Sequence, residues 1–153
     1  MKIATIQYTG ELSTEIRHHS SQSTVITDAP IDNQGLGRYL SPTDMTACSL
    51  GSCMITIMAI KFKSLYQTDL EGLSACIHKT MQSQPRRISS ITVELYFSKG
   101  NFNQAQQKNL VQWAQECPVA LSLHPEIKQV IKDRKSTRLN SSHIPLSRMP
   151  SSA

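Results

Sequence analysis

Apolar and polar residues alternate along the N-terminal segment, with the two-residue period that is typical of β-strands. Alternation over Lys2–Tyr8 predicts a first strand, and Gly10 marks the turn after it. The β-branched content of Ser13–His19 and Thr24–Thr27 predicts two more short strands. Asp28–Leu40 is rich in proline, asparagine and glycine, a composition that predicts a loop.

The next segment carries the strongest local signal in the chain. Ser41-Pro42-Thr43-Asp44 has the residues of a capping box, with serine at the N-cap, proline at the first helical position and an acid at the third. The pattern predicts a helix to about Tyr66, roughly 25 residues and 37 Å long. Its centre, Leu50–Ile60, is apolar nearly all round, so we expect this helix to be buried on most sides.

After Gly72 the period returns to two residues, and helical patterns follow. Leu73–Met81 and Ile88–Ser98 are predicted strands. Further elements are a hairpin loop over Gln82–Arg87, a polar helix over Asn103–Glu116, a short helix from Cys117-Pro118 and a last strand over Glu126–Lys132. Antiparallel strands around a buried helix indicate an α+β fold.

Composition limits the class of protein. The chain has 153 residues, 39% of them hydrophobic, which suits one globular domain. Its densest apolar stretch, Met54–Ile60, is far shorter than the roughly 18 residues of a membrane span. The N-terminus lacks the apolar block of a secretion signal. We therefore expect a soluble, cytoplasmic protein with no membrane partner, in which the four cysteines are free thiols, metal ligands or redox groups.

The net charge of +5 is concentrated at the C-terminus. Asp133–Ala153 contributes +3 of it, contains six serines and has no hydrophobic period. The stretch from Asp133 to His143 resembles the translation of a common short-read sequencing adapter, so we interpret residues 133–153 as a non-native, disordered tail. The domain then spans residues 1–132. A nucleic-acid-binding hypothesis depends largely on the tail, and we expect no nucleic-acid partner.

Two cysteines stand at positions that allow chemistry. Cys53 lies mid-helix, where a cysteine is usually a small core residue. Gly51 lies nearby, and because glycine costs about 1 kcal/mol in a helix, we expect a close approach to the backbone there. Cys117 precedes Pro118 at a helix start, where the helix dipole favours a thiolate, although such a cysteine can also merely begin a helix.

The remaining candidates favour structural roles. Cys48 lies about 140° from Cys53 around the helix, so the two cannot easily share a zinc ion. Cys76 is expected in the core, and Arg86 with Arg87 in a solvated turn. The histidines show no metal-ligand spacing, so we expect neither a metal nor a cofactor.

Ordered motifs along residues 1–132 resemble the OsmC/Ohr superfamily of osmotically induced and organic hydroperoxide resistance proteins. They are Ser41-Pro-Thr-Asp-Met, Leu50-Gly-Ser-Cys-Met-Ile-Thr-Ile-Met58, Leu70-Glu-Gly72, Pro85-Arg-Arg-Ile88 and Cys117-Pro-Val with Ser122-Leu-His-Pro125. The resemblance implies an intertwined homodimer, in which sheets wrap two long helices and the active sites lie at the subunit interface. It also implies two-cysteine peroxidase chemistry on organic hydroperoxides, with Cys53 as the peroxidatic and Cys117 as the resolving cysteine, and an external dithiol as reductant.

Two positions depart from the family pattern. Well-characterised members carry a glutamate ten residues before the peroxidatic cysteine, where this chain has Thr43. The neighbouring Asp44 lies on the opposite side of the helix from Cys53. Those members also place an arginine near the first strands, where a gapless match gives Leu12. Arg17, and after it Arg38, are the candidates to assist the Cys53 thiolate.

The sequence thus favours a thiol peroxidase, and the apolar residues around Cys53 favour a hydrophobic peroxide as substrate. A different class of function stays open. A non-enzymatic homodimer could bind an apolar ligand between its helices, with cysteines that are only redox-sensitive. Ligand affinity that persists without cysteines would distinguish this hypothesis from the enzyme.

Overall fold

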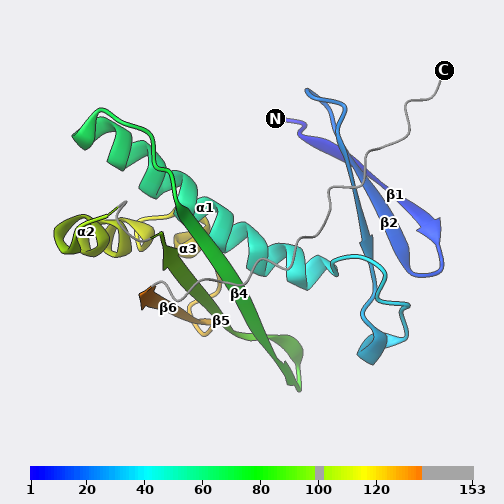
Figure 1. Ribbon diagram of the computed structural model, residues 1–153. Helices are drawn as coiled ribbons and strands as arrows, with labels where there is room; N and C mark the ends of the chain where they lie inside the picture. The colour runs from blue at the N-terminus through cyan, green and yellow to red at the C-terminus, as the bar shows by residue number, and fades with distance from the viewer. Residues whose placement is uncertain (99–101, 136–153) are drawn as a thin grey trace.

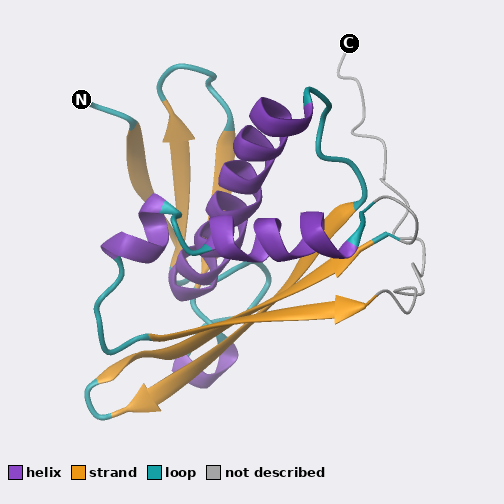
Figure 2. Ribbon diagram, turned by 90° about the vertical axis from the view of Figure 1, so that its left-hand side faces the viewer, coloured by secondary structure: helices purple, strands orange, loops and turns teal. Residues whose placement is uncertain are grey.

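The computed structural model describes residues 1–98 and 102–135. Two three-stranded sheets lie at different places along one long helix, α1, which spans Pro42–Tyr66 (Figure 1). The two sheets form separate groups of strands, as the view in Figure 2 shows. The order of strands and helices along the chain is the predicted one, and the fold class is α+β. Most of the tail, residues 136–153, lies outside the described residues.

Sheet A contains the three N-terminal strands in antiparallel order: β1 (Ala4–Gly10), β2 (Ser13–His18) and β3 (Thr24–Asp28). Its register aligns Ile6, Ile16 and Val25 in one row across the strands. A short 3₁₀ helix, η1 (Ile31–Asn33), lies in the predicted loop. Sheet A stands away from the middle of α1 (Figure 1), and its apolar row is not covered by the rest of the chain.

The capping box at the start of α1 forms as the sequence predicts. The Ser41 hydroxyl accepts a hydrogen bond from the Asp44 backbone N–H at 3.1 Å, and the Asp44 carboxylate accepts one from the Ser41 N–H at 2.9 Å. These bonds satisfy N–H groups that have no partner within the helix. Lys79 of β4 adds a cation to this cap, because its ammonium donates to Asp44 Oδ1 at 2.5 Å.

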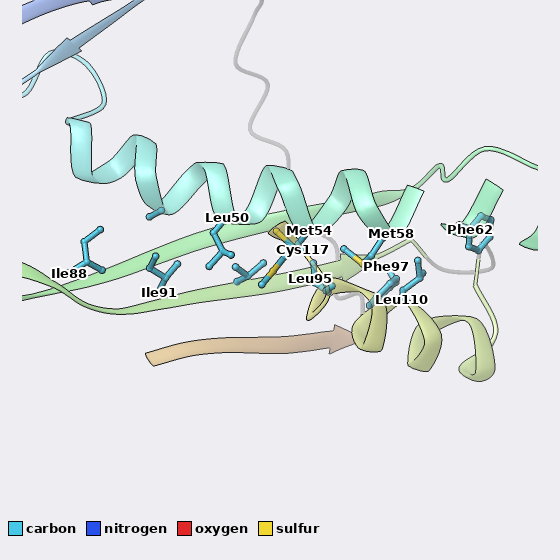
Figure 3. Close-up of a cluster of buried hydrophobic side chains, with 13 residues drawn as sticks. Leu50, Met54, Met58, Phe62, Ile88, Ile91, Leu95, Phe97, Leu110 and Cys117 are labelled. Atoms are coloured by element: carbon cyan, nitrogen blue, oxygen red, sulfur yellow. The ribbon is translucent and has the colours of Figure 1, made fainter. Parts of the chain in front are cut away.

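One face of α1 is buried, rather than most sides as the sequence suggested. Leu50, Met54, Met58 and Phe62 point from α1 toward sheet B (Figure 3). On other faces of the helix, Ile60 and Leu65 are exposed. By length and composition alone α1 could cross a bilayer. Its buried stripe packs on a sheet, as expected for the core helix of a globular domain.

Sheet B contains β4 (Leu73–Ser83), β5 (Arg86–Phe97) and β6 (Lys128–Lys135). β4 and β5 pair antiparallel, but β6 pairs parallel with β5, so the expectation of antiparallel sheets is wrong for this strand. The chain crosses from β5 to β6 through two helices, α2 (Gln104–Ala114) and α3 (Pro118–Ser122). Such a crossover brings the next strand back in the same direction.

The last strand also extends farther than predicted. β6 includes the first three residues of the segment interpreted as a tail, and Arg134 donates a hydrogen bond to Glu94 of β5 at 2.9 Å. Glu94 lies on the outer face of sheet B with its side chain almost covered. The bonds from Arg134 and from the Tyr96 hydroxyl lower the pKa of Glu94 to about 2.

The glycine within α1 has the close neighbour that its position predicts. A Cβ at Gly51 would lie 2.4 Å from Cδ1 of Ile77, a β4 side chain that packs directly on the helix backbone. We expect Gly51→Ala to destabilise the protein by about 1 kcal/mol, because overpacking costs about 1–3 kcal/mol and the gain in helix propensity returns about 1 kcal/mol. Urea unfolding measures the difference.

The control for this prediction is Ile77→Val, which removes the nearest atom. In that background Gly51→Ala should be neutral or stabilising. An equal stabilisation by Gly51→Ala in both backgrounds would show that Ile77 does not impose the glycine.

The lowered pKa of Glu94 predicts how the stability of the protein changes at low pH. Its pKa is depressed in the folded state, so its carboxylate contributes to stability fully above the ordinary value of about 4.5, and the contribution is lost as the pH falls toward 2. Between pH 5 and pH 2.5 the parent should therefore lose stability more steeply than Glu94→Gln in chemical unfolding. Arg134→Gln should give an intermediate slope, and identical slopes in all three proteins would contradict the assignment.

Candidate functional site

The fold brings Cys53 and Cys117 together. Cys53 lies in the middle of α1 and is half-buried, while Cys117 is the N-cap of α3 and is fully buried. Their thiols are close enough to hydrogen-bond to each other. Figure 3 shows Cys117 within the core beside Met54, the residue that follows Cys53. The two cysteines that the sequence singled out thus form one site.

Cys117 has a raised pKa, contrary to the expectation that a helix start would favour its thiolate. Burial is the largest cause, and the hydrogen bond to Cys53 acts in the same direction. The backbone N–H groups of Ala120 and Val119 oppose the shift without reversing it. Because α3 has only five residues, few peptide dipoles are aligned there to offset desolvation. Cys117 therefore keeps its proton and can donate it toward the Cys53 sulfur.

An ion pair fastens the segment that carries Cys117. Glu116 directly precedes Cys117, and its carboxylate pairs with the ammonium of Lys61 on α1. The Cys117 N–H also donates to the Ala114 carbonyl at the end of α2. Contacts on both sides thus hold the turn between α2 and α3 against α1.

A cavity of about 350 Å³ lies near the cysteine pair, although neither cysteine is among its lining residues. Met54, Ala120 and Leu121 are part of its lining, and Ala120 is also the residue whose N–H faces the Cys117 sulfur. The other lining residues come from α2, the segment after it and β6: Val111, Gln115, Gln129 and Ile131. Five of the seven lining residues are apolar and two are glutamines, so the cavity offers both apolar and hydrogen-bonding contacts and no charged side chain.

Within one chain the structure does not bring Arg17 or Arg38 to Cys53. Arg17 is exposed on β2 and pairs with Glu15 of the same strand at 3.4 Å. Arg38 donates from Nε to Asp28 at 3.1 Å, and its other nitrogens bond Glu11 and Ser13 at 3.0 Å. Led by the Arg38 backbone N–H, these bonds lower the pKa of the buried Asp28.

The two positions that depart from the family pattern, Leu12 and Thr43, line one second cavity of about 240 Å³. It lies where the loop after sheet A meets the start of α1. Arg86 at the start of β5 lines it too, and its guanidinium pairs with Asp32 at 3.1 Å. Hydroxyl and amide groups complete the polar part of the lining: Thr14, Thr27, Asn33 and Ser41.

The sequence did not predict that Arg86 lines a cavity, because the local pattern predicted a solvated turn for Arg86 and Arg87. Both arginines instead reach across the fold: Arg86 to Asp32, and Arg87 to Glu126 near β6. The strands extend to Ser83 and from Arg86, so the turn itself is only two residues long. Nothing in the spacing of the hairpin indicates these distant partners.

The other cysteines lie apart from the pair. Cys76 is opposite Glu94 in the register of sheet B, so it belongs to the outer face and not to the core as expected. Cys48 is half-buried on α1. Within residues 1–98 and 102–135, no group of three histidine, cysteine or acidic side chains could hold a metal ion.

Comparison with known proteins places this arrangement in a family. The model of the OsmC-like protein family matches residues 35–132. The crystal structure of a Psychrobacter arcticus 273-4 protein, described as an osmotic stress induced and detoxification response protein, is 40% identical, with a TM-score of 0.82 over 88% of this chain and 96% of that one. No curated protein matches the chain.

More distant structures share the fold. The organic hydroperoxide resistance protein OsmC from Legionella pneumophila has a TM-score of 0.67 at 14% identity, over 87% of this chain and 97% of that one. The organic hydroperoxide resistance protein OhrB of Bacillus subtilis has a TM-score of 0.60 at 12% identity, over 87% and 98%. The family match over most of the domain and the 40% identical structure together show that this chain belongs to the OsmC-like protein family.

Proposed function

We propose that the protein is a thiol peroxidase that reduces organic hydroperoxides with Cys53 and Cys117, in defence against oxidative stress. The closeness of these two thiols carries the proposal, because they interact with each other although they lie 64 positions apart in the sequence. A disulfide requires Cα atoms within about 7 Å, a demand that chance pairs of cysteines rarely meet. Membership of a family that includes organic hydroperoxide resistance proteins supports it.

In the first step the Cys53 thiolate attacks the terminal oxygen of the hydroperoxide. A sulfur–oxygen bond forms, the O–O bond breaks, and the alkoxide leaves as an alcohol after it takes a proton. Cys117 is placed to stabilise the thiolate beforehand, since its protonated thiol can donate a hydrogen bond to the Cys53 sulfur. Cys53 is left as a sulfenic acid, two electrons more oxidised than the thiol.

In the second step Cys117 attacks the Cys53 sulfur. The S–S bond forms, and the sulfenic hydroxyl leaves as water after it gains the Cys117 proton. An external dithiol then reduces the disulfide, so one turnover converts hydroperoxide and dithiol into alcohol, water and oxidised dithiol. No cofactor takes part in this scheme. A reducing compartment such as the cytoplasm would supply the dithiol, and all four cysteines are free thiols in the structure.

The cavity beside the pair supports a hydrophobic substrate. Five of its seven lining residues are apolar, and these can contact the organic group of a hydroperoxide. The same cavity is what a non-enzymatic carrier of an apolar ligand would need. The two functions differ in whether Cys53 is required.

We further propose that the protein is a homodimer. Ile6, Tyr8 and Val25 of sheet A are 65%, 64% and 46% exposed, although they share one face of the sheet. A three-stranded sheet needs cover on its apolar face to be stable. A second copy of the chain offers the matching uncovered surface, because α1 also exposes Ile60 and Leu65.

The dimer generates a prediction. Multi-angle light scattering at micromolar concentration should give twice the chain mass, because uncovered apolar surface of this extent favours an obligate interface. Replacing Ile6 and Val25 by aspartate should yield monomers or aggregates, whereas Ser20→Asp on an exposed turn should leave the dimer intact. A stable, soluble parent monomer would contradict the proposal.

The chemistry generates a second prediction. With cumene hydroperoxide and a dithiol, Cys53→Ser should abolish peroxide consumption, at least a hundredfold below the parent. Cys117→Ser should lose turnover with the dithiol and accumulate a sulfenic acid on Cys53, which dimedone labels and mass spectrometry detects.

Cys48→Ser and Cys76→Ser are the matched controls and should consume peroxide at the parental rate. Full activity of Cys53→Ser, or no peroxide consumption by the parent with any dithiol, would exclude the enzyme. Unchanged affinity for an apolar fluorescent probe in a cysteine-free variant would then favour the ligand carrier.

A further inference from the structure

The segment that carries Cys117 has little packing of its own. α3 contains five residues, none of which is buried, and its N-cap makes no side-chain hydrogen bond to the helix. Within the described stretch 115–124, Cys117 is the only buried residue. A helix this short is not stable by itself. The position of the Cys117 sulfur therefore depends on contacts that other elements make with this segment.

One of these contacts comes from β6. Gln129 pairs with the buried Ile91 in the register of sheet B, so its side chain lies on the inner face of the sheet. A polar group in such a place needs a hydrogen-bond partner, and the Gln129 amide donates to the Ala120 carbonyl of α3 at 2.8 Å. The N–H of the same alanine faces the Cys117 sulfur. Gln129 thus ties α3 to the sheet.

A second contact comes from α1. The ammonium of Lys61 pairs with the carboxylate of Glu116, the residue directly before Cys117. Lys61 follows Cys53 by eight residues, so the pair links the helix of one cysteine to the segment of the other. Among the ion pairs of the described residues, no other joins α1 to the chain between α2 and β6. Lys61 and Glu116 are 35% and 52% exposed, so replacing them does not open the core.

The position of Cys117 matters because Cys53 has two possible fates once it is a sulfenic acid. Cys117 can attack its sulfur and form the disulfide. Alternatively, a second hydroperoxide can transfer its terminal oxygen to the sulfur and leave as alcohol, which yields a sulfinic acid that a dithiol cannot reduce. A thiol that is already held in place loses little conformational entropy when the disulfide forms, so it reacts at a high effective concentration.

We propose that Gln129 and the Lys61–Glu116 ion pair are positioning residues, which hold Cys117 beside Cys53 and thereby favour disulfide formation over further oxidation of Cys53. In the favoured step the S–S bond forms, and the sulfenic hydroxyl leaves as water with the Cys117 proton. This inference rests on the proposed peroxidase function, and it names the contacts that make the second cysteine effective.

The test uses glutathione and no peroxide, in a background that keeps only Cys53 and Cys117. Oxidised glutathione forms a mixed disulfide with Cys53, and Cys117 then displaces glutathione to close the protein disulfide. The equilibrium gives the effective concentration of Cys117 toward Cys53. It should fall about fivefold in Gln129→Met and about threefold in Lys61→Met, because the net effect of one hydrogen bond or one exposed ion pair is of this size.

Each variant has a matched control that removes the same type of side chain. Lys63→Met removes another exposed ion pair of α1. Gln115→Met replaces another glutamine that lines the cavity of about 350 Å³, as Gln129 does. Both controls should keep the parental effective concentration. Losses in the controls as large as those in the two test variants would overturn the proposal.

Exchanging the two charges separates placement from a general loss of stability. Lys61→Glu combined with Glu116→Lys restores an ion pair, so the effective concentration should return to the parental value. Either change alone brings two like charges together and should lower the effective concentration more than Lys61→Met does. No recovery in the exchanged protein would overturn the role of the pair. Because both residues are partly exposed, this test remains decisive if Gln129→Met fails to fold.

Cumene hydroperoxide tests the consequence for over-oxidation. Sulfenic acid should form on Cys53 at the parental rate in every variant. The variant that combines Gln129→Met with Lys61→Met should accumulate sulfinic acid, detected by mass spectrometry, at a peroxide concentration about fifteenfold lower, since effects at separate sites multiply. Equal thresholds in this variant and the parent would overturn the proposal. A parent that forms no sulfenic acid would refute the peroxidase, whereas the glutathione equilibrium would still decide whether these residues position Cys117.

Discussion

The packing of the apolar stripe of α1 on the inner face of sheet B is the constraint on which the cysteine site depends. Successive helical residues point about 100° apart. Once Met54 is buried against the sheet, the direction of Cys53 is therefore fixed, and it faces the turn that carries Cys117. The packing of Ile77 against Gly51 helps to hold α1 in this orientation, since the Ile77 side chain occupies the space that a Cβ at Gly51 would take. The structural core thereby sets the geometry of the thiols.

The same packing has opposite consequences for the two cysteines. Complete burial raises the pKa of Cys117 and keeps it protonated, so it is a poor nucleophile toward peroxide. Cys53 lies at the edge of the stripe and is only half-buried, so it is more accessible than Cys117. These different environments suit the two roles in the proposed mechanism, in which Cys53 meets the peroxide and Cys117 is the proton donor and resolving thiol.

Much of this fold could be predicted from local patterns. The capping box placed the start of α1, and proline after Cys117 placed the start of α3, because caps depend on neighbouring residues only. The parallel pairing of β6 could not be predicted, since it depends on how α2 and α3 return the chain to the sheet. The depth at which Cys117 is buried, and therefore the direction of its pKa shift, likewise follows from tertiary packing. The position of Cys117 at a helix start predicted a lowered pKa, whereas the pKa is raised.

The positive charges near the start of α1 come from sheet B, and not from the positions in α1 and after β1 that the family resemblance singled out. Leu12 and Thr43 are uncharged, yet Lys79 of β4 and Arg86 of β5 bring two cations to the same region. An electrostatic environment is a property of the space around a group, and residues from any neighbouring strand can contribute to it. Sheet B therefore supplies cations near the start of α1 without a change in the fold that holds the two cysteines together.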